Sequence, residues 1–253
     1  MTRLPRQIST TGYYHIVFRG VNHCHLFEED EDYEKFLALL AAVKDNLGLK
    51  VHAYCLLSNH AHLLIHEDEP GDIILAMRKL LGPYANWFNR KYLRSGSLIA
   101  NRYKSLCVES DGYLLALVRY IHQNPLVAGM AKRIEMYPYS SYRDYARGGS
   151  TLVDTSVVLG FFSDDDQKAL DAFVSFHATQ ETADYSLSDG IKKSEKEIQD
   201  GIASALGNIK PSAVCGLPRQ ERNAILGSLR KRGFSIRQIE RATGISRKII
   251  ERT

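Results

Sequence analysis

Hydrophobic and polar residues follow two different rhythms along the first 150 positions of the chain. Runs with period two predict strands, and apolar residues three or four positions apart predict helices. The expected elements, in order, are a strand at Tyr13–Phe18, a helix at Asp32–Leu47, strands at Lys50–Leu57 and His60–His66, a helix from Gly71 to about Tyr92, a strand at Arg102–Glu109, and a helix that begins at Asp111 and ends at Pro125. The first six have the split βαβ order, so we predict an α+β ferredoxin-like domain over residues 1–148.

The remainder of the chain predicts helices only, which makes the C-terminal region all-α. Gly148, Gly149 and Ser150 mark a domain boundary. Residues 149–208 are predicted to form an acidic helical spacer, with helical segments around Asp154–Phe162 and Asp164–Thr179 and a polar stretch at Ser186–Asp200.

Residues 209–253 show the pattern of a helix-turn-helix. An amphipathic helix that ends at Gly233 precedes a second helix, which Ser235 caps and which carries Ile236, Ile239 and Ala242 inward. Gly244 suits a left-handed turn, Ile245 enters the core, and Ser246 caps a third helix. We predict a DNA-binding helix-turn-helix here, and a small helical dimerisation module is the alternative.

The net charge changes sign along the chain, although the total is only +4. Residues 1–150 contain 18 lysines and arginines against 15 acidic residues, residues 151–208 contain 4 against 11, and residues 209–253 contain 11 against 3. Between Ile73 and Val108 there are seven basic residues and no acidic one. Two basic regions around an acidic spacer are typical of a protein that binds a polyanion at two sites, although solvated helix faces give similar counts.

Composition also excludes several classes of protein. No run of about 18 apolar residues is present, which excludes a membrane-spanning helix. The first residues, MTRLPRQISTTGYY, lack the apolar region of a secretory signal. The four cysteines have no CxxC spacing, which argues against a disulfide scaffold or a zinc ribbon. We therefore expect a cytoplasmic protein.

Two histidines on one predicted strand are the leading candidates for chemistry. Alternate side chains of a strand share a face, so His60 and His62 point to one side, while Ala61, Leu63 and Ile65 point into a core. Two imidazoles on one exposed face are well placed to hold a divalent metal, although ordinary surface histidines give the same pattern. A second His-x-His, at His23 and His25, lies in a turn, where the two side chains are not forced to project together.

The helix after Asp111 supplies a candidate nucleophile. Tyr120 and Asn124 are four residues apart and lie on one line, away from the centre of the apolar stripe. Tyr113 falls on the same line and is a competitor. A tyrosine beside a two-histidine metal site suggests a nucleophile next to a Lewis acid.

These motifs together resemble a known family. The stretches LSNHAHLLI, GSLIANRYKS, YLLALVRYIHQNPLVAGM and YPYSSYRDY, in this order over roughly residues 10–146, resemble the single-tyrosine HUH transposases, and among these the REP-associated tyrosine transposases. The chain departs from the family at Ile99–Asn101, where Phe-Gln-Gly is frequent, and at Arg19–His23, which is often Arg-Gly-Asn-Asn-Arg. Both departures lie where they would alter DNA contacts, and neither involves the metal ligands or the nucleophile.

The resemblance implies a role for each matching residue. His60 and His62 match the metal ligands, Tyr120 matches the catalytic tyrosine, and Asn124 matches a polar residue that completes metal coordination. The implied activity is cleavage and rejoining of single-stranded DNA near hairpins, with Mg²⁺ or Mn²⁺ and a covalent 5′-phosphotyrosine. Because an unperturbed tyrosine has a pKa of about 10, it needs activation by the metal or by a base such as His122, which lies on another side of the helix.

DNA contacts are expected from three groups of residues: Arg102, Tyr103 and Lys104 of the RYKS strand, Arg90, Lys91 and Arg94 of the long helix, and Arg247 and Lys248 of the recognition helix. The expected partners are single-stranded and hairpin DNA and a second copy of the chain, since two cleavages need two tyrosines. On this interpretation the protein associates with the nucleoid when it binds DNA and contacts no membrane. A non-cleaving DNA-binding regulator and an unrelated metal hydrolase are the alternatives.

Overall fold

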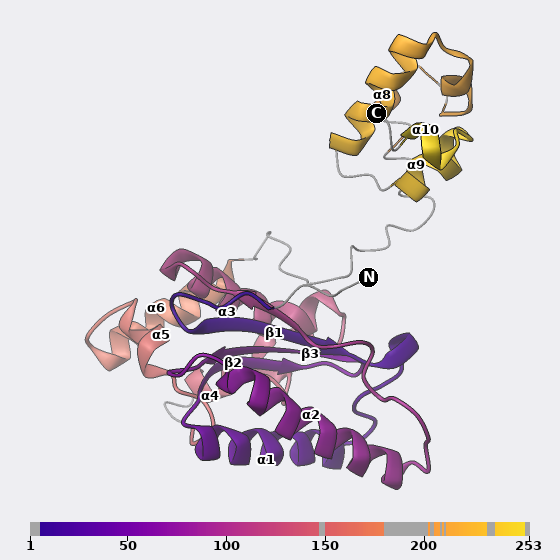
Figure 1. The fold of residues 1–253 in the computed structure, drawn as a ribbon. Coiled ribbons are helices and arrows are strands. Elements are labelled where there is room, and N and C mark those ends of the chain that lie inside the picture. The colour runs from indigo at the N-terminus through magenta and orange to yellow at the C-terminus, as the bar shows by residue number, and fades with distance from the viewer. Residues whose placement is uncertain are drawn as a thin grey trace. The chain divides into compact units, whose positions relative to one another are not determined.

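The structure, a computed structural model, describes residues 6–146, 150–179, 202, 205–207, 209, 211–231 and 236–250. The chain divides into two compact units, Met1–Ser186 and Leu187–Thr253 (Figure 1). Each unit has its own cluster of buried hydrophobic residues, so each is described by itself. Within the described residues, no helix combines the length and the apolar character needed to cross a bilayer.

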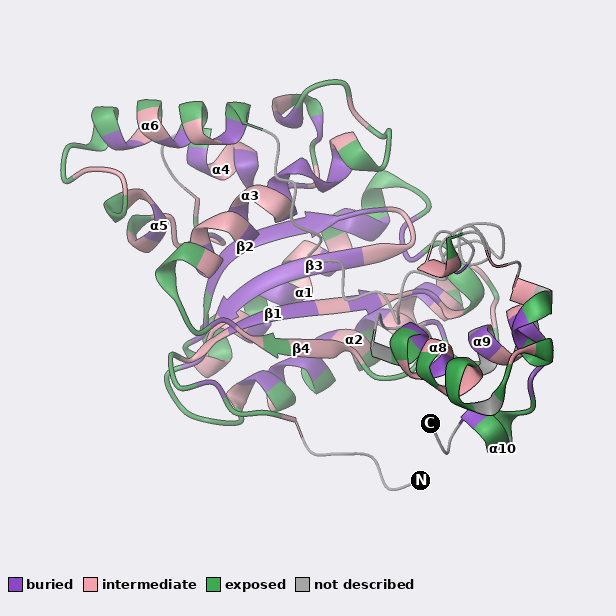
Figure 2. Ribbon diagram, turned by 90° about the horizontal axis from the view of Figure 1, so that it is seen from above, coloured by how far each residue is buried: buried purple, intermediate pink, exposed green. Residues whose placement is uncertain are grey.

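The first unit is built on a four-stranded sheet. Its strands are β1 (Tyr13–Arg19), β2 (Lys50–Leu56), β3 (His60–His66) and β4 (Lys104–Cys107), in the order β2-β3-β1-β4, and every neighbouring pair is antiparallel. β1 and β2, which are consecutive strands of the chain, are therefore separated by β3. The two central strands and β2 are largely buried, whereas β4 is a short, more exposed edge (Figure 2).

Helices cover both faces of this sheet. α1 (Asp30–Leu47) and α2 (Asp72–Lys91) lie on one face, and α3 (Asp111–Val127) lies on the other (Figure 1). α1 begins with a capping box between Glu29 and Asp32 and ends at Gly48, whose φ of 65° is the left-handed conformation that favours glycine. The mixed α and β architecture and the predicted order of elements are thus confirmed.

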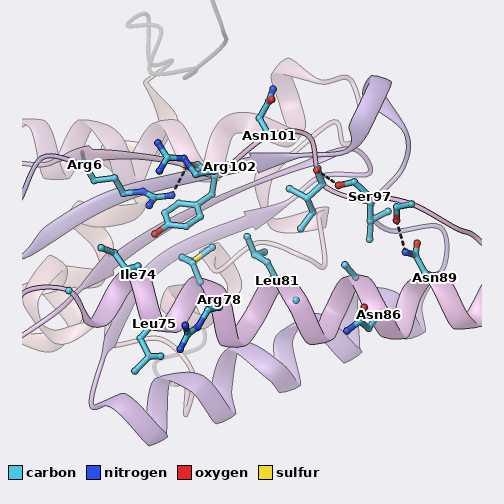
Figure 3. Close-up of a pocket in the computed structure, with 18 residues that line it drawn as sticks. Arg6, Ile74, Leu75, Arg78, Leu81, Asn86, Asn89, Ser97, Asn101 and Arg102 are labelled. Atoms are coloured by element: carbon cyan, nitrogen blue, oxygen red, sulfur yellow. Dashed lines mark hydrogen bonds between the residues drawn. The ribbon is translucent and has the colours of Figure 1, made fainter. Parts of the chain in front are cut away.

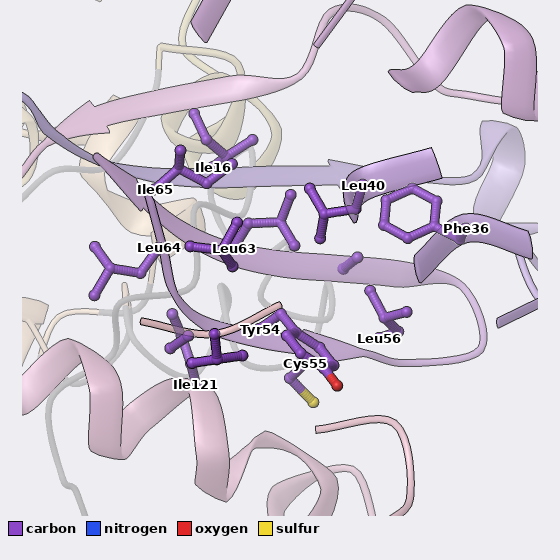
Figure 4. Packing of buried hydrophobic residues seen from close by; sticks show 14 of the residues in the cluster. Ile16, Phe36, Leu40, Tyr54, Cys55, Leu56, Leu63, Leu64, Ile65 and Ile121 are labelled. Carbon is purple, nitrogen blue, oxygen red and sulfur yellow. The ribbon is translucent and has the colours of Figure 1, made fainter. Parts of the chain in front are cut away.

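The alternation of side chains along β3 determines what each face contains. Ala61, Leu63 and Ile65 are buried on the α1 and α2 side, and Leu63, Ile65 and Phe36 of α1 are labelled in Figure 4. On this side Phe18 of β1 packs against Phe36 with ring centroids 5.5 Å apart. His60 and His62 share the opposite face, as predicted, and α3 lies on that side. This second face is not open to solvent as expected, because α3 packs on it, and His62 is only 2% exposed.

The ends of α3 and β4 differ from the prediction. α3 continues past Pro125 to Val127, and the N–H of Ala128 still donates to the carbonyl oxygen of Asn124 at 2.9 Å. Proline removes a single backbone donor, and so close to a helix end the following residues keep their own hydrogen bonds. β4 is shorter than the predicted strand, since its pairing with β1 extends only from Lys104 to Cys107.

The segment after the predicted boundary near residue 148 packs with the first unit. It contains α5 (Ser156–Gly160) and α6 (Asp166–Ala178), and it follows η2 (Ile134–Met136) and α4 (Tyr142–Ala146). Phe173 of α6 is fully buried and stacks on Tyr145 of α4, with ring centroids 4.6 Å apart. These aromatic contacts join residues 150–179 to the first unit, and the predicted polar stretch Ser186–Asp200 lies outside the described residues.

The described part of the second unit is entirely helical. It contains η3 (Pro211–Gly216), α8 (Arg219–Lys231), α9 (Ile236–Thr243) and α10 (Arg247–Ile250). Gly244 has a φ of 72° between the last two helices, and Ile239 and Ile245 are buried in this unit's own core, as the sequence predicts. The predicted cap Ser235 lies outside the described residues.

Candidate active site

The two HUH histidines lie side by side on β3. The ring centroids of His60 and His62 are 5.2 Å apart, and the ring planes are nearly perpendicular at 79°. The Nδ1 atom of His60 is hydrogen-bonded to Oδ1 of Asn59 at 2.7 Å, so this nitrogen carries the proton. The Nε2 atom of His60 is then the one with a lone pair for a ligand.

A third histidine, which the sequence analysis did not single out, supports the second one. His15 of β1 is fully buried, and its Nε2 lies 3.0 Å from Nδ1 of His62. The two rings are stacked with centroids 5.3 Å apart. The contact is possible because Val17 pairs with His62 in the sheet, which places His15 diagonally across from His62 on the same face. A hydrogen bond to one imidazole nitrogen fixes which nitrogen faces a metal.

Burial keeps all three imidazoles uncharged at neutral pH. Desolvation lowers the pKa of His60 to about 4, with smaller contributions from the nearby Arg19 and His23, and lowers the pKa of His15 to about 3. The pKa of His62 is also well below its ordinary value, first because of burial and then because of His15 and His60. Neutral imidazole is the form that ligates metal ions, so no proton has to leave these rings before they can act as ligands.

α3 brings the candidate nucleophile to this histidine cluster. The ring of Tyr120 meets those of His62 and His15 edge-on, at centroid distances of 5.5 and 6.3 Å. Asn124 follows one turn later, and its Nδ2 donates to the carbonyl oxygen of Tyr120 at 2.9 Å. This bond uses the amide nitrogen and leaves the amide oxygen as the atom that Asn124 can offer to a cation.

His122 is separated from Tyr120 by the geometry of the helix. It is fully buried, with Nδ1 3.0 Å from Nε2 of His177 and Nε2 2.7 Å from Oγ of Ser141. Both ring nitrogens are therefore committed to α6 and to the start of α4, and burial holds the pKa of His122 well below its usual value. This histidine joins elements of the fold, and the structure gives it no access to the Tyr120 hydroxyl.

The donor set fits a divalent cation. Among the described residues no group of three or more His, Cys, Asp or Glu side chains converges as a metal site. Two neutral imidazoles on one face form a smaller protein set, which leaves coordination positions for an amide oxygen, substrate oxygens and water. Mg²⁺ in particular retains several such positions, and nitrogen and oxygen donors also suit Mn²⁺.

Comparison with known proteins identifies the unit that contains this cluster. Residues 8–124 match the family model described as "Transposase IS200 like". This match ends at Asn124 and includes both histidines and Tyr120. The first unit belongs to the IS200-like transposases. The chain is accordingly an enzyme of the transposase class.

One solved structure agrees with this assignment at the level of the fold. A REP-associated tyrosine transposase bound to a REP hairpin is 19% identical, with a TM-score of 0.51, and the match covers 61% of this chain and 93% of that one. A candidate transposase from Deinococcus radiodurans R1 is 20% identical with a TM-score of 0.34, covering 48% of this chain and 97% of that one. No curated protein matches the chain.

Two cations of the transposase unit share the face of the histidines. Arg19 lies opposite His60 in the pairing of β1 with β3. Val17 pairs with both His62 and Lys104, which aligns these residues across three strands. Residues paired in this way project to the same side of a sheet, so Lys104 of the RYKS segment lies beside the candidate active site.

The other predicted DNA-binding residues lie in different surroundings. Arg102 is exposed, and the Arg6 guanidinium lies 3.9 Å above the ring of Tyr103. Arg90 and Arg94 line a hollow of about 530 Å³. Lys91 is directed to α1, where Nζ bonds to Glu29, Glu31 and Asp32 at 2.7–2.9 Å. Of these cations, Lys91 is the one whose surroundings least favour a DNA contact.

The recognition-helix residues lie in the second unit. Arg247 begins α10 and is exposed, and its backbone N–H donates to Oε1 of Glu240 at 3.1 Å. The side chain of Lys248 lies outside the described residues.

The fully buried His15 is the main member of the site that sequence reasoning missed. Its strand, Tyr13–Phe18, alternates in the same way as β3, and His15 falls on the face opposite Tyr14 and Ile16. A histidine on one face of another alternating strand of the same predicted domain was therefore a usable signal. The pairing register, which brings His15 to His62 rather than to solvent, was not visible in the sequence.

Proposed function

We propose that the chain is a metal-dependent single-tyrosine DNA transposase of the HUH type that cleaves and rejoins single-stranded DNA next to hairpins, similar to the REP-associated tyrosine transposases. One observation carries the proposal. Within a domain of the IS200-like transposase family, the half-buried Tyr120 lies against His62, with ring centroids 5.5 Å apart. A nucleophile beside a candidate metal ligand is the arrangement that phosphodiester cleavage requires.

The histidine face would hold the cation. Mg²⁺ or Mn²⁺ would be held by His60, His62 and Asn124, and when bound it would supply Lewis-acid polarisation of the scissile phosphate. His15 would keep the His62 ring in a ligating orientation through the 3.0 Å contact. Arg19, opposite His60, is placed to neutralise phosphate charge on the same face.

Tyr120 would perform the covalent step. Its phenolate oxygen attacks the phosphorus in line, the bond from phosphorus to the 3′ oxygen breaks, and that oxygen takes up a proton from water to become a free 3′-OH. The product is a 5′-phosphotyrosine on the protein, and attack by another 3′-OH reverses the step and joins strands without an external energy source. The phenolic proton passes to solvent, because Tyr120 is partly exposed and His122 is enclosed by Ser141 and His177.

Substrate contacts would come from both units. Lys104, beside the histidine face, and the exposed Arg90 and Arg102 would contact DNA in the first unit, whose strand order we interpret as the ferredoxin-like split βαβ arrangement. Helices α9 and α10, with the left-handed Gly244 between them, would form a helix-turn-helix that places Arg247 at a DNA groove. Two chains would supply the two tyrosines for paired cleavages.

The test incubates the full chain with a labelled hairpin oligonucleotide that carries single-stranded flanks, in the presence of Mg²⁺ or Mn²⁺. The sequence of the oligonucleotide is taken from the repeats that flank the gene for this protein. We expect a protein–DNA adduct that survives denaturation, is lost in Tyr120→Phe and is retained in Tyr113→Phe. The Tyr113 variant is a matched control, since both tyrosines lie on α3 and are half-buried.

Three other outcomes would contradict this proposal. Retention of the adduct in Tyr120→Phe with loss in Tyr113→Phe would transfer the nucleophile to Tyr113. Hairpin binding without any wild-type adduct would favour a regulator that does not cleave. Metal-dependent cleavage that yields no adduct and survives Tyr120→Phe would favour a hydrolase that uses water.

A further inference from the structure

A pocket of about 820 Å³ opens in the first unit between α2 and the segment that precedes β4 (Figure 3). Its apolar lining includes Ile74, Met77 and Leu81 of α2, and Leu98 and Ile99 face them from the other side. In Figure 3, Ile74 and Leu81 point from the helix toward the segment that carries Asn101 and Arg102. None of the residues assigned to metal or nucleophile lines this pocket, and its volume suits a ligand of small-molecule size.

The charge of the pocket has one sign. Arg6, Arg78 and Arg102 line it, and its 18 lining residues include no aspartate or glutamate. Arg6 is held in place, because its guanidinium stacks 3.9 Å above the Tyr103 ring. Arg78 and Arg102 are exposed. Guanidinium groups around an apolar floor select a ligand that is anionic on one side and apolar on the other.

Two polar groups of lining residues lack a hydrogen-bond partner among the described residues. The hydroxyl of Tyr103 and Oδ1 of Asn89 are both buried and unpaired. The Asn89 amide is anchored by its other atom, Nδ2, which donates to the carbonyl oxygen of Gly96 at 2.9 Å. Buried polar groups are nearly always satisfied, so a bound molecule that reached these two atoms would give each of them a hydrogen bond.

We propose that this arginine-rimmed pocket receives an unpaired nucleotide of the single-stranded DNA next to the hairpin. The base lies on the apolar floor, and its phosphates lie on Arg6, Arg78 and Arg102. A duplex cannot fill the pocket, because its bases are stacked inside the helix and only its phosphates reach the rim. This inference rests on the proposed function, since it identifies which part of a DNA substrate the first unit recognises.

The neighbouring surface continues the path for the strand. Asn86 and Asn89 line both this pocket and the hollow of about 530 Å³ formed with Arg90 and Arg94. The nucleotides on one side of the inserted base would therefore have further cations for their phosphates. A basic groove that follows the backbone, with a platform for a base, is the usual design for binding single strands.

Arg78 and Lys79 provide a matched pair for the test. Both are exposed cations on α2, and only Arg78 lines the pocket. Binding of the full chain is measured without divalent metal, so that no cleavage occurs, on a hairpin with a single-stranded flank and on the same hairpin with blunt ends. We expect Arg78→Ala to weaken binding of the flanked hairpin about tenfold more than Lys79→Ala does, and to lower its salt dependence by about 0.7 in log–log slope. On the blunt hairpin the two variants should be equal.

A second measurement locates the base. Each flank nucleotide is replaced in turn by an abasic site and, separately, by the fluorescent base 2-aminopurine. At one flank position, removal of the base should weaken binding of the DNA, and 2-aminopurine at that position should change its fluorescence when the protein binds. Leu81→Trp, which fills the floor of the pocket, should abolish both effects. This variant should keep the thermal unfolding temperature of the wild type. If Leu81→Trp does not fold, the comparison of Arg78→Ala with Lys79→Ala tests the pocket assignment instead.

Failure of this inference differs from failure of the proposed function. Equal losses in Arg78→Ala and Lys79→Ala on flanked DNA, with no flank position sensitive to loss of its base, would overturn the pocket assignment even if the Tyr120-dependent adduct forms. Absence of the adduct together with a sensitive flank position would overturn cleavage and leave the pocket as a site for single-stranded DNA.

Discussion

The two faces of the β3 strand differ in what their burial achieves. Ala61, Leu63 and Ile65 meet α1 and α2 in a layer of mainly apolar and aromatic residues, whereas His60 and His62 meet α3 together with His15. Both faces are enclosed by helices, and both contain fully buried residues. On the first face burial removes apolar surface from water and so stabilises the fold. On the second face burial depresses imidazole pKa values and the contact with His15 orients the His62 ring, as the proposed cation site would require.

This difference shows how one strand supports stability and chemistry with adjacent residues. Because successive side chains point to opposite sides, a substitution at one position reaches only one of the two layers. The faces should therefore respond to substitution in separable ways. Substitutions on the apolar face should lower the free energy of unfolding, and those on the histidine face should lower metal binding and DNA cleavage.

The largest effect is expected for His62→Ala. Removal of a candidate metal ligand that also contacts Tyr120 should reduce the covalent adduct to the level of Tyr120→Phe. His66→Ala is the matched control, because His66 is on the same strand and face but packs against Tyr13 instead. Denaturing gels with a labelled hairpin and Mn²⁺ measure the adduct. Equal losses in both variants would show that any histidine on this face supports the fold rather than the reaction.

Leu63→Ala tests the opposite face of the same strand. Leu63 is completely buried, and truncation of such a side chain should lower the free energy of unfolding by about 2–5 kcal/mol. Urea unfolding followed by circular dichroism gives this number. At a temperature where the variant remains folded, its adduct yield per folded molecule should equal that of the wild type. A specific loss of adduct would mean that the two faces are coupled through the strand.

Much of this architecture was predictable because it depends on local pattern. The alternation in HAHLLIH placed His60 and His62 opposite Leu63, and the four-residue spacing placed Tyr120 and Asn124 on one line of a helix. Pairing between distant segments was not predictable. The register of β1 brings His15 to His62, and the packing of α6 buries Phe173 against Tyr145, and neither is encoded in a short window of sequence.

A smaller effect is expected for His15→Ala, which removes a support and leaves the ligands in place. Without the contact to Nδ1, the His62 ring loses its fixed orientation, and Mn²⁺ affinity should fall about 10–100-fold, as is usual for residues behind a metal ligand. His15→Gln, which retains a hydrogen-bonding side chain, should recover part of the affinity. Calorimetric titration with Mn²⁺ in the absence of DNA measures the metal affinity separately from catalysis. Unchanged affinity in His15→Ala would assign His15 to packing alone.

The smallest effect, about 2 kcal/mol for each histidine, is expected from pH. The pKa of His15 is about 3 in the folded chain and about 6.5 when unfolded, so between these values the unfolded chain binds the extra proton. The stability that depends on neutral His15 is therefore fully present above pH 6.5 and is lost progressively as the pH drops toward 3. At pH 5 the loss from a single such histidine is about 2 kcal/mol.

His15→Leu isolates this contribution from those of the other histidines. Its free energy of unfolding, measured by urea titration at pH 7.5 and at pH 5, should fall less than that of the wild type between the two values, by about 2 kcal/mol. Leu63→Ala is the control, because a change on the apolar face lowers stability equally at both pH values. If the free energy of unfolding of His15→Leu and of the wild type fell by the same amount between pH 7.5 and pH 5, His15 would take up its proton without unfolding of the chain. The histidine face would then be open to water in the absence of metal.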